Sequence, residues 1–276
     1  LPERRAPIGA ESLPPMKTFA RSRVRPAARP NAQLAQDFME LTFRMESGRV
    51  VPRFTRFEDE ITVAIRGRAP ASLTTDLRRL LARLRAEAGI DIRPARPGED
   101  VSIWIEVLPR RALQRVVPQA ACFVVPRVES WAEFRRVRRT PQVDWTTLET
   151  RRRAAVFLPG DVSPQEARDC LHEELAQALG PLNDLYRLPD SVFNDDNFHT
   201  VLTGFDMLML RITYDPALTS GMSQQQVADR LPGILARLNP AGRRTGAPVA
   251  TPTPRDWTAA IERALGPRTS PEDRVA

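Results

Sequence analysis

The sequence predicts an α/β (α+β) protein in which one mixed sheet is followed by an α-helical C-terminal half. Short apolar runs typical of strands occur between residues 57 and 158, separated by helical patterns. From residue 164 onward, apolar residues recur every three or four positions, which is the spacing of helices. The chain has 276 residues, 42% hydrophobic and 27% charged, an ordinary globular composition.

Residues 1–31 predict a basic, disordered lead-in, because prolines and arginines occur there without apolar periodicity. Such a segment could tether the protein to an anchor in the cell envelope, or it could be a plain disordered terminus. A removed N-terminal segment before Leu1 would fit the tether. We therefore expect a periplasmic or secreted protein, with membrane tethering as an open alternative.

Helices and strands alternate in the first half of the chain. A helix is predicted from Asn31, with an apolar face that runs to Met45 and an end at Gly48. Residues 57–65 alternate as a strand, and residues 73–84 form a leucine stripe typical of a helix.

Three further strands are predicted before the helical half. Residues 101–107 alternate cleanly, whereas residues 121–125 and 154–158 are continuous apolar runs that suit strands buried on both faces. Between these runs, residues 131–153 combine arginines with two tryptophans. That mixture could be a nucleic-acid patch, but a solvated helix and loop between two strands is the interpretation we prefer.

The charge and the rare residue types exclude several classes of function. The net charge is +7, but 34 acidic residues are interspersed among 41 basic ones, so no nucleic-acid partner is expected. No apolar run approaches the roughly 20 residues of a transmembrane helix. With His172 and His199 alone, one chain cannot supply three histidines to a metal. Cys122 and Cys170 allow one bridge in an oxidising compartment, or two buried thiols.

The C-terminal half is predicted to consist of helices. Ser163 and Pro164 start a helix that Gly180 ends. Further helices are expected over 198–212, over 222–238 with a break at Pro232 and Gly233, and over 257–265. The predicted organisation is a lead-in (1–31), one domain (32–240), and a linker, short helix and polar tail (241–276).

The helix before Gly180 resembles a zinc-protease helix, but with changed ligands. His172 and Glu173 would begin an HExxH motif, in which two histidines four residues apart share one helix face. The partner position holds Ala176, so this alignment fails.

Shifted by one residue, the segment EELAQALGPLN overlays the metzincin pattern HExxHxxGxxH. The glutamate and the glycine match at Glu174 and Gly180. The three ligand positions hold Glu173, Gln177 and Asn183 instead of histidines. Further along, residues 191–194 occupy the place of the methionine-containing turn, with Phe193 in the position of the methionine.

Taken together, the motifs EELxQxLG, SxFND and LTxFDxLMLR resemble a proteobacterial family known as domain of unknown function 2927. The resemblance covers residues 34–238. It implies an envelope location, since members are often described as lipoproteins or secreted proteins, and a zincin-like fold. It implies no known activity.

The metzincin-like pattern, and not the family, assigns roles to the residues of one expected cleft. Glu174 would be the general base that deprotonates water. Glu173, Gln177, Asn183 and Asp184 would hold a metal or the water, and four further residues would surround them, namely Gly180, Phe193, His172 and His199. The alternative is a solvated helix face with surface histidines. Two neighbouring carboxylates should repel, so that at least one has a raised pKa.

The cofactor is left open. A divalent metal is one option, although typical zinc ligands are missing and neutral amide oxygens bind zinc poorly. Calcium would accept Glu173, Asn183, Asp184 and the Asp195–Asp196 pair more readily.

The sequence predicts a divergent metallopeptidase-like cell-envelope protein, either a hydrolase or a catalytically inactive descendant. The alternative is a non-catalytic envelope module that uses the same cleft for a peptide or protein partner. We also expect Cys122 and Cys170 to lie close enough to bond, if strand 121–125 passes beside helix 164–179.

Overall fold

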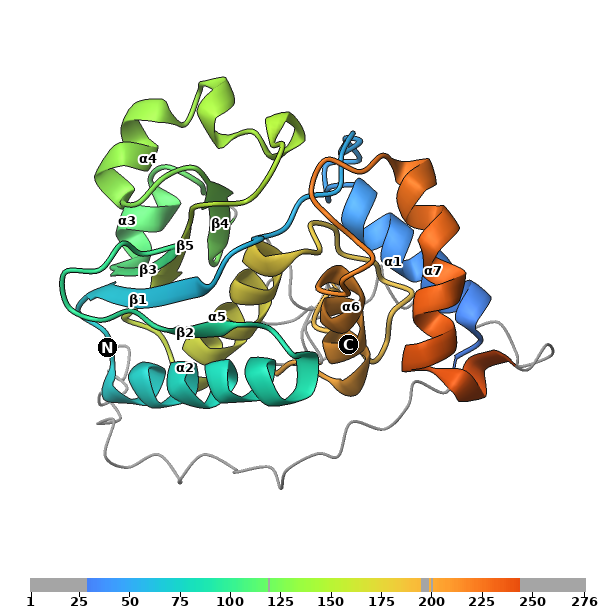
Figure 1. Ribbon diagram of the computed structural model, residues 1–276. Helices are drawn as coiled ribbons and strands as arrows, with labels where there is room; N and C mark the ends of the chain where they lie inside the picture. The colour runs from blue at the N-terminus through green and yellow to red at the C-terminus, as the bar shows by residue number, and fades with distance from the viewer. Residues whose placement is uncertain (1–28, 119, 195–198, 200, 244–276) are drawn as a thin grey trace, which may run out of the picture.

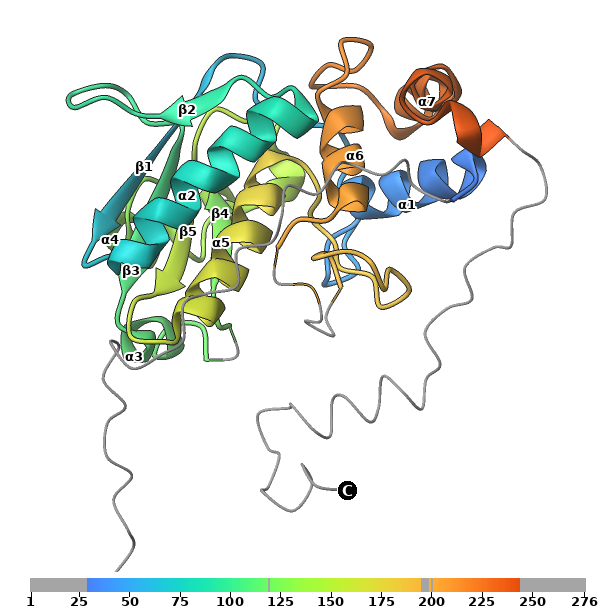
Figure 2. The ribbon, with the colours of Figure 1, turned by 90° about the horizontal axis from the view of Figure 1, so that it is seen from below.

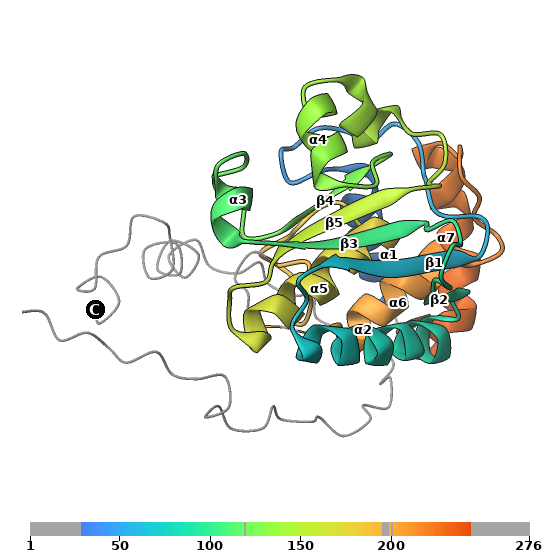
Figure 3. The same cartoon turned by 90° about the vertical axis from the view of Figure 1, so that its left-hand side faces the viewer.

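The computed structural model describes residues 29–118, 120–194, 199 and 201–243. A five-stranded sheet forms its centre, in the order β2-β1-β3-β5-β4. The strands are β1 (Ile61–Gly67), β2 (Ile92–Pro94), β3 (Ile103–Leu108), β4 (Phe123–Pro126) and β5 (Ala154–Pro159). All neighbours are parallel except β4, which runs antiparallel to β5 at the edge (Figure 3). The predicted mixed sheet in an α/β protein is therefore confirmed.

Helices cover both faces of the sheet. On one face, α2 (Ala71–Arg83) and α5 (Pro164–Leu179) lie side by side (Figure 2). The last turn of α2 widens into a π-helical turn over Leu84–Ala88. On the other face lie the short helices α3 (Arg110–Gln114) and α4 (Trp131–Val137). Strand β5 is buried along its whole length, as its continuous apolar run predicts.

Four aromatic rings fill the space between the sheet and α4. The rings of Phe123, Trp131, Phe134 and Phe157 have centroids 5.2 to 6.2 Å apart. These rings belong to a second hydrophobic core, separate from the main one. Within the arginine-rich segment 131–153, Trp131 packs against this second core, while Trp145 is buried in the main core. The remainder of the segment contains two short 3-10 helices, Pro141–Val143 and Trp145–Thr147.

The C-terminal helices pack with the first helix of the chain. α1 (Asn31–Phe43) lies against α7 (Gln224–Leu238), and α6 (Gly204–Thr213) lies between them and the sheet part (Figures 1 and 2). A last 3-10 helix spans Pro240–Arg243. α6 begins with a capping box between Thr203 and Asp206.

Some local predictions were wrong for identifiable reasons. The predicted break at Pro232 does not occur: α7 continues through it, with Pro232 and Gly233 exposed and the apolar side of the helix buried. α1 ends at Phe43 instead of Gly48, since the chain turns back there to pair Arg44 with Val50. Strand β2 has three residues, too few to show an alternating pattern.

The last residues of the predicted lead-in contact the domain. Arg29 pairs with buried Asp37 of α1 at 3.1 Å and with Asp190, and its guanidinium lies 4.5 Å from the centre of the Phe205 ring. Residues 1–28, 195–198 and 244–276, which include the predicted helix 257–265, lie outside the described residues. Within the described ranges, no helix combines the length and the apolar character needed to cross a bilayer.

Candidate functional site

Helix α5 carries the side chains that the sequence singles out. Pro164 stands at its first position, and the Ser163 hydroxyl accepts a hydrogen bond from the Glu166 amide at 3.1 Å. The second half of α5 is buried on nearly all sides, so its polar residues face other parts of the protein instead of bulk water. Among them, Glu174 and Gln177 are buried and Glu173 is half-buried.

The C-terminal end of α5 is held by Arg151, a residue that sequence reasoning missed. Its Nη1 donates to the carbonyl oxygens of Gln177 and Ala178 at 2.6 and 2.7 Å, and its Nη2 donates to that of Gly180 at 2.6 Å. The buried guanidinium also lies 4.8 Å from the centre of the Trp145 ring. Burial lowers the pKa of Arg151 to about 10, so it remains a cation at neutral pH. Arg151 thereby satisfies carbonyls that a helix end leaves open.

Gly180 is required by space and not by a left-handed turn. Its φ of −169° is extended backbone, open to any residue. A Cβ atom there would lie 2.9 Å from Cγ2 and 3.0 Å from Oγ1 of Thr213 on α6. Gly180 follows the last residue of α5, as the sequence predicts, and its missing side chain lets α5 and α6 approach.

A cavity of about 480 Å³ opens along α5 at the antiparallel edge of the sheet. Its walls come from the loop after α1, the start of β4, the Trp145 turn, α5 and the loop after α5. The lining residues are Met45, Glu46, Ser47, Ala120, Ala121, Cys122, Phe123, Val124, Trp145, Glu173, Glu174, Gln177, Leu182 and Asp184. Four of these are acidic and none is basic, in a chain with a net charge of +7.

Glu174 is the most strongly perturbed group of this cavity. Its side chain is 5% exposed, and among the described residues its Oε2 atom has no hydrogen-bond partner. Burial raises the pKa of Glu174 well above the ordinary value, and the negative charges of Glu173 and Glu46 raise it further. A buried carboxyl with one unused oxygen can donate or accept a proton, or bind a cation.

Gln177 lies between the other acidic groups. Its Nε2 atom is 3.5 Å from Oε1 of Glu46 and 3.4 Å from Oδ2 of Asp184, both at the long end of the hydrogen-bond range. The Gln177 amide therefore lies between the carboxylates of Glu46, in the loop after α1, and Asp184, in the loop after α5. These contacts are weak enough for a ligand to replace them.

Five of the expected site residues do not line this cavity, namely Gly180, Phe193, Asn183, His172 and His199. Asn183 is buried but does not line the cavity, because its Nδ2 donates to the backbone oxygen of Glu40 at 3.2 Å. His172 accepts a hydrogen bond from the Leu202 amide at 3.2 Å, and burial lowers its pKa to about 3. His199 is exposed, with its Nε2 atom 2.8 Å from the Pro189 oxygen.

The motif around Phe193 anchors the loop after α5. Phe193 is fully buried in the main core, and its carbonyl accepts from the Leu185 amide at 3.0 Å. The Ser191 hydroxyl donates to Oδ1 of Asp206 at 2.6 Å, while the Thr203 amide donates to Oδ2 at 2.7 Å. Asp206 therefore ties this turn to the start of α6, a structural role that the SxFND and FD strings could have indicated.

A disulfide joins Cys122, just before β4, to Cys170 on α5, with the Cα atoms 5.9 Å apart. Cys122 lines the cavity, so this bond connects the strand wall of the cavity to its helix wall.

The residues that the structure describes do not form a metal site. Within the described part of the chain, no three His, Cys, Asp or Glu side chains are grouped closely enough to hold an ion. Moreover, Asn183 turns toward α1, and Gln177 offers only a neutral amide. Asp195 and Asp196, named as calcium ligands, lie outside the described residues.

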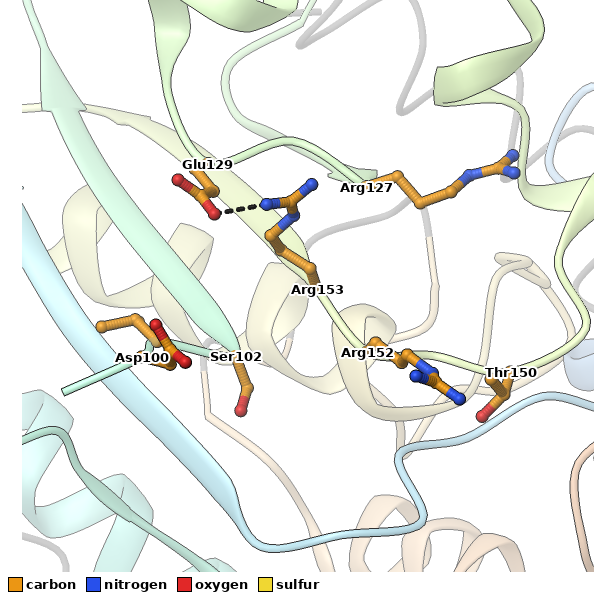
Figure 4. Close-up of a pocket in the computed structure, with 8 residues that line it drawn as sticks. Asp100, Ser102, Arg127, Glu129, Thr150, Arg152 and Arg153 are labelled. Carbon is orange, nitrogen blue, oxygen red and sulfur yellow. Dashed lines mark hydrogen bonds and ion pairs between the residues drawn. The ribbon is translucent and has the colours of Figure 1, made fainter.

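A second cavity, of about 530 Å³, lies at the opposite end of the strands and contains three arginines (Figure 4). Arg153 pairs with Glu129, and Arg127 points away to the loop over Pro141–Val143, where it donates to the Gln142 oxygen at 2.9 Å. Asp100 adds a further negative charge. Most of its charge is thus already compensated, and the acidic cavity remains the candidate site.

Fold and cavity together define an α/β protein with an acidic cavity at the antiparallel edge of its mixed sheet. The chain belongs to the family described as "Protein of unknown function (DUF2927)", which matches residues 31–233. The family predicted from the motifs is thereby confirmed. Comparison with curated proteins and with solved structures found no match.

Proposed function

We propose that this chain is a metallopeptidase-like protein of the cell envelope whose cleft binds an extended peptide as a non-catalytic module. The observation that carries the proposal is the position of the acidic cavity beside the outer edge of β4. Edge strands offer unpaired backbone groups to a peptide that adds to the sheet as a further strand.

The pairing register indicates which backbone groups β4 offers. The Arg127 amide donates to the Arg153 oxygen at 2.8 Å, so this pair is hydrogen-bonded across β4 and β5. Hydrogen-bonded pairs alternate along an antiparallel ladder. Because Val125 is opposite Ala155 and Val124 opposite Val156, the amide and carbonyl of Val124 point away from β5.

The two ends of this edge have different surroundings. Near Arg127 it is covered by the loop of Pro141–Val143, where Gln142 Nε2 donates to the Arg127 oxygen at 3.0 Å. The other end, from Cys122 to Val124, lines the cavity. In the described structure, no backbone hydrogen bond outside the β4–β5 pair uses the Val124 amide. A peptide is therefore expected to pair at Val124 and to direct a side chain into the cavity.

The envelope location rests on the disulfide and on the family resemblance. A bond between Cys122 and Cys170 persists in oxidising compartments and is rare in the cytosol. The zincin-like interpretation is supported by the mixed sheet with its antiparallel edge strand beside the helix of Glu174.

A second candidate function is hydrolysis with Glu174 as the acid or base. The raised pKa of a buried, cavity-lining carboxyl favours it. Against it stands the lack of a grouped metal-ligand set in the described residues.

The test uses a fluorescein-labelled, acetyl-blocked peptide of alternating threonine and valine with one central arginine. Anisotropy should report saturable binding to the full chain, and mass spectrometry should find the peptide intact after incubation with or without added zinc or calcium. Val124→Pro should abolish binding, because proline removes the outward amide while the fold tolerates it at an edge. Val124→Ile is the matched control and should bind. Cleavage that is lost in Glu174→Gln would instead establish the hydrolase; undiminished binding by Val124→Pro would exclude strand addition.

A further inference from the structure

We infer that the acidic cavity selects a basic side chain, arginine in preference to lysine, from the peptide that pairs with β4. This inference rests on the proposed function and adds the chemistry of the residue that enters the cavity. It is carried by the charge of the lining, by the unused oxygen of Glu174, and by the apolar walls around them.

All charged residues of the described lining are acidic. Glu46, Glu173, Glu174 and Asp184 line the cavity from three segments. The ion pairs of the described residues do not involve Glu46 or Glu174. Carboxylates that share a partly enclosed space repel one another, so a cationic ligand gains from Glu174 and from Glu46 beside it.

Glu174 provides a point of attachment inside the cavity. Its Oε2 atom is buried and has no hydrogen-bond partner among the described residues, although a buried oxygen normally has one. A guanidinium presents several N–H donors in one plane and can satisfy this oxygen together with a second carboxylate. An ammonium is a compact point charge that cannot bridge two carboxylates in that planar way.

The walls suit the aliphatic part of an arginine side chain. Met45, Phe123, Val124 and Leu182 line the same cavity as the acids. Long basic side chains bury their methylene stems against apolar surface while their charged heads reach polar groups. The volume of about 480 Å³ lies within the range of roughly 300–1,000 Å³ that ligand pockets have.

Binding of a cation should release a proton from the Glu174 carboxyl. Burial keeps Glu174 protonated over a wider pH range than an ordinary glutamate, with Glu173 on its own helix and Glu46 and Asp184 from the neighbouring loops as the charged groups that face the cavity. A bound guanidinium favours the ionised carboxylate. Affinity for the basic peptide should therefore rise with pH until Glu174 is ionised in the free protein.

The experiment compares four forms of the threonine–valine peptide that differ only at the central residue: arginine, lysine, citrulline and glutamate. Citrulline has the shape of arginine without its charge. We expect arginine to bind about tenfold or more tightly than citrulline, with lysine between them and glutamate weakest. Free agmatine and spermidine serve as competitors, and strong displacement by either alone would mean that the cavity binds a small cation and not a peptide side chain.

Two variants distinguish the loss of the Glu174 charge from a general effect of removing a carboxylate. Glu174→Gln should reduce the preference for arginine over citrulline and remove its pH dependence. Glu149→Gln is the matched control, since Glu149 is exposed and outside the cavity lining. Equal affinities for arginine and citrulline would overturn the selection while leaving peptide binding intact; no binding by any of the four would refute both.

Discussion

Gly180 and Thr213 are in contact where helices α5 and α6 meet, and the contact leaves no room for a methyl group on the glycine. A Cβ atom on residue 180 would be 2.9 Å from Cγ2 of Thr213, closer than real Cβ atoms come. The glycine of the EELAQALG motif therefore sets the distance between α6 and the helix that lines the cavity.

Gly180→Ala should lower the free energy of unfolding by about 1–3 kcal/mol through overpacking. Urea denaturation of the full chain measures it. Gly233→Ala is the control: Gly233 lies in α7, and a methyl group added there would meet nothing within 4 Å, so alanine should stabilise by about 0.5–1 kcal/mol. A neutral Gly180→Ala would mean that α6 moves freely against α5.

Glu174→Gln should stabilise the protein increasingly as the pH rises. The pKa of Glu174 is raised in the folded state by burial and by Glu173 and Glu46, so folding favours its protonated form. That contribution is present below the unfolded pKa and is lost as the pH rises toward the folded pKa. Glutamine resembles the protonated carboxyl and avoids the loss.

Thermal unfolding between pH 4 and pH 8 tests this, since the two proteins should be alike at the acidic end. The exposed control Glu149→Gln should show a pH profile parallel to that of the unchanged protein. A constant difference between Glu174→Gln and the unchanged protein across the range would contradict the raised pKa.

Arg151→Met should destabilise the protein by about 3 kcal/mol or more, because three buried carbonyls at the end of α5 lose their donor. The neighbouring Arg152 is exposed, so Arg152→Met should change stability by no more than about 0.5 kcal/mol. Chemical denaturation of both variants gives the comparison. Equal effects would mean that water replaces Arg151 without cost.

The sequence indicates the elements better than it indicates the site. The alternation of Ile103, Ile105 and Val107 predicts β3, since every second side chain of that strand enters the main core. Likewise, helix α5 follows from its Ser163 cap and its apolar spacing. Such signals are local, and both elements lie close to the residues for which they are predicted.

The surroundings of the site depend on contacts that no local pattern encodes. Glu46 reaches the cavity from 127 residues before Glu173, and Arg151 reaches the end of α5 from a separate loop. Asn183 matches the spacing of a metal ligand, but its side-chain amide donates to the Glu40 carbonyl of α1 instead. Pairings of this kind are decided by tertiary packing, so the sequence predicts the helix but not the residues that surround it.

Reduction of the disulfide should lower the free energy of unfolding by about 2–4 kcal/mol, because the bond closes a loop with a sequence separation of 48 residues. It should also weaken peptide binding, since Cys122 and Cys170 connect β4 with α5 on two sides of the cavity. Thermal unfolding with and without reductant measures the first effect.

A Cys122→Ala, Cys170→Ala double variant is the control for the reductant. It should match the reduced protein, and further reductant should leave it unchanged. If the reductant does not change the stability of the unchanged protein, β4 and α5 are held together without the disulfide.

Amide hydrogen exchange at Val124 tests the central claim most directly. With the arginine peptide at saturation, the Val124 amide should exchange at least about tenfold more slowly, because it gains a partner strand, while the Val125 amide, already paired with β5, should change little. Saturated peptide binding with unchanged exchange at Val124 would contradict strand addition at β4.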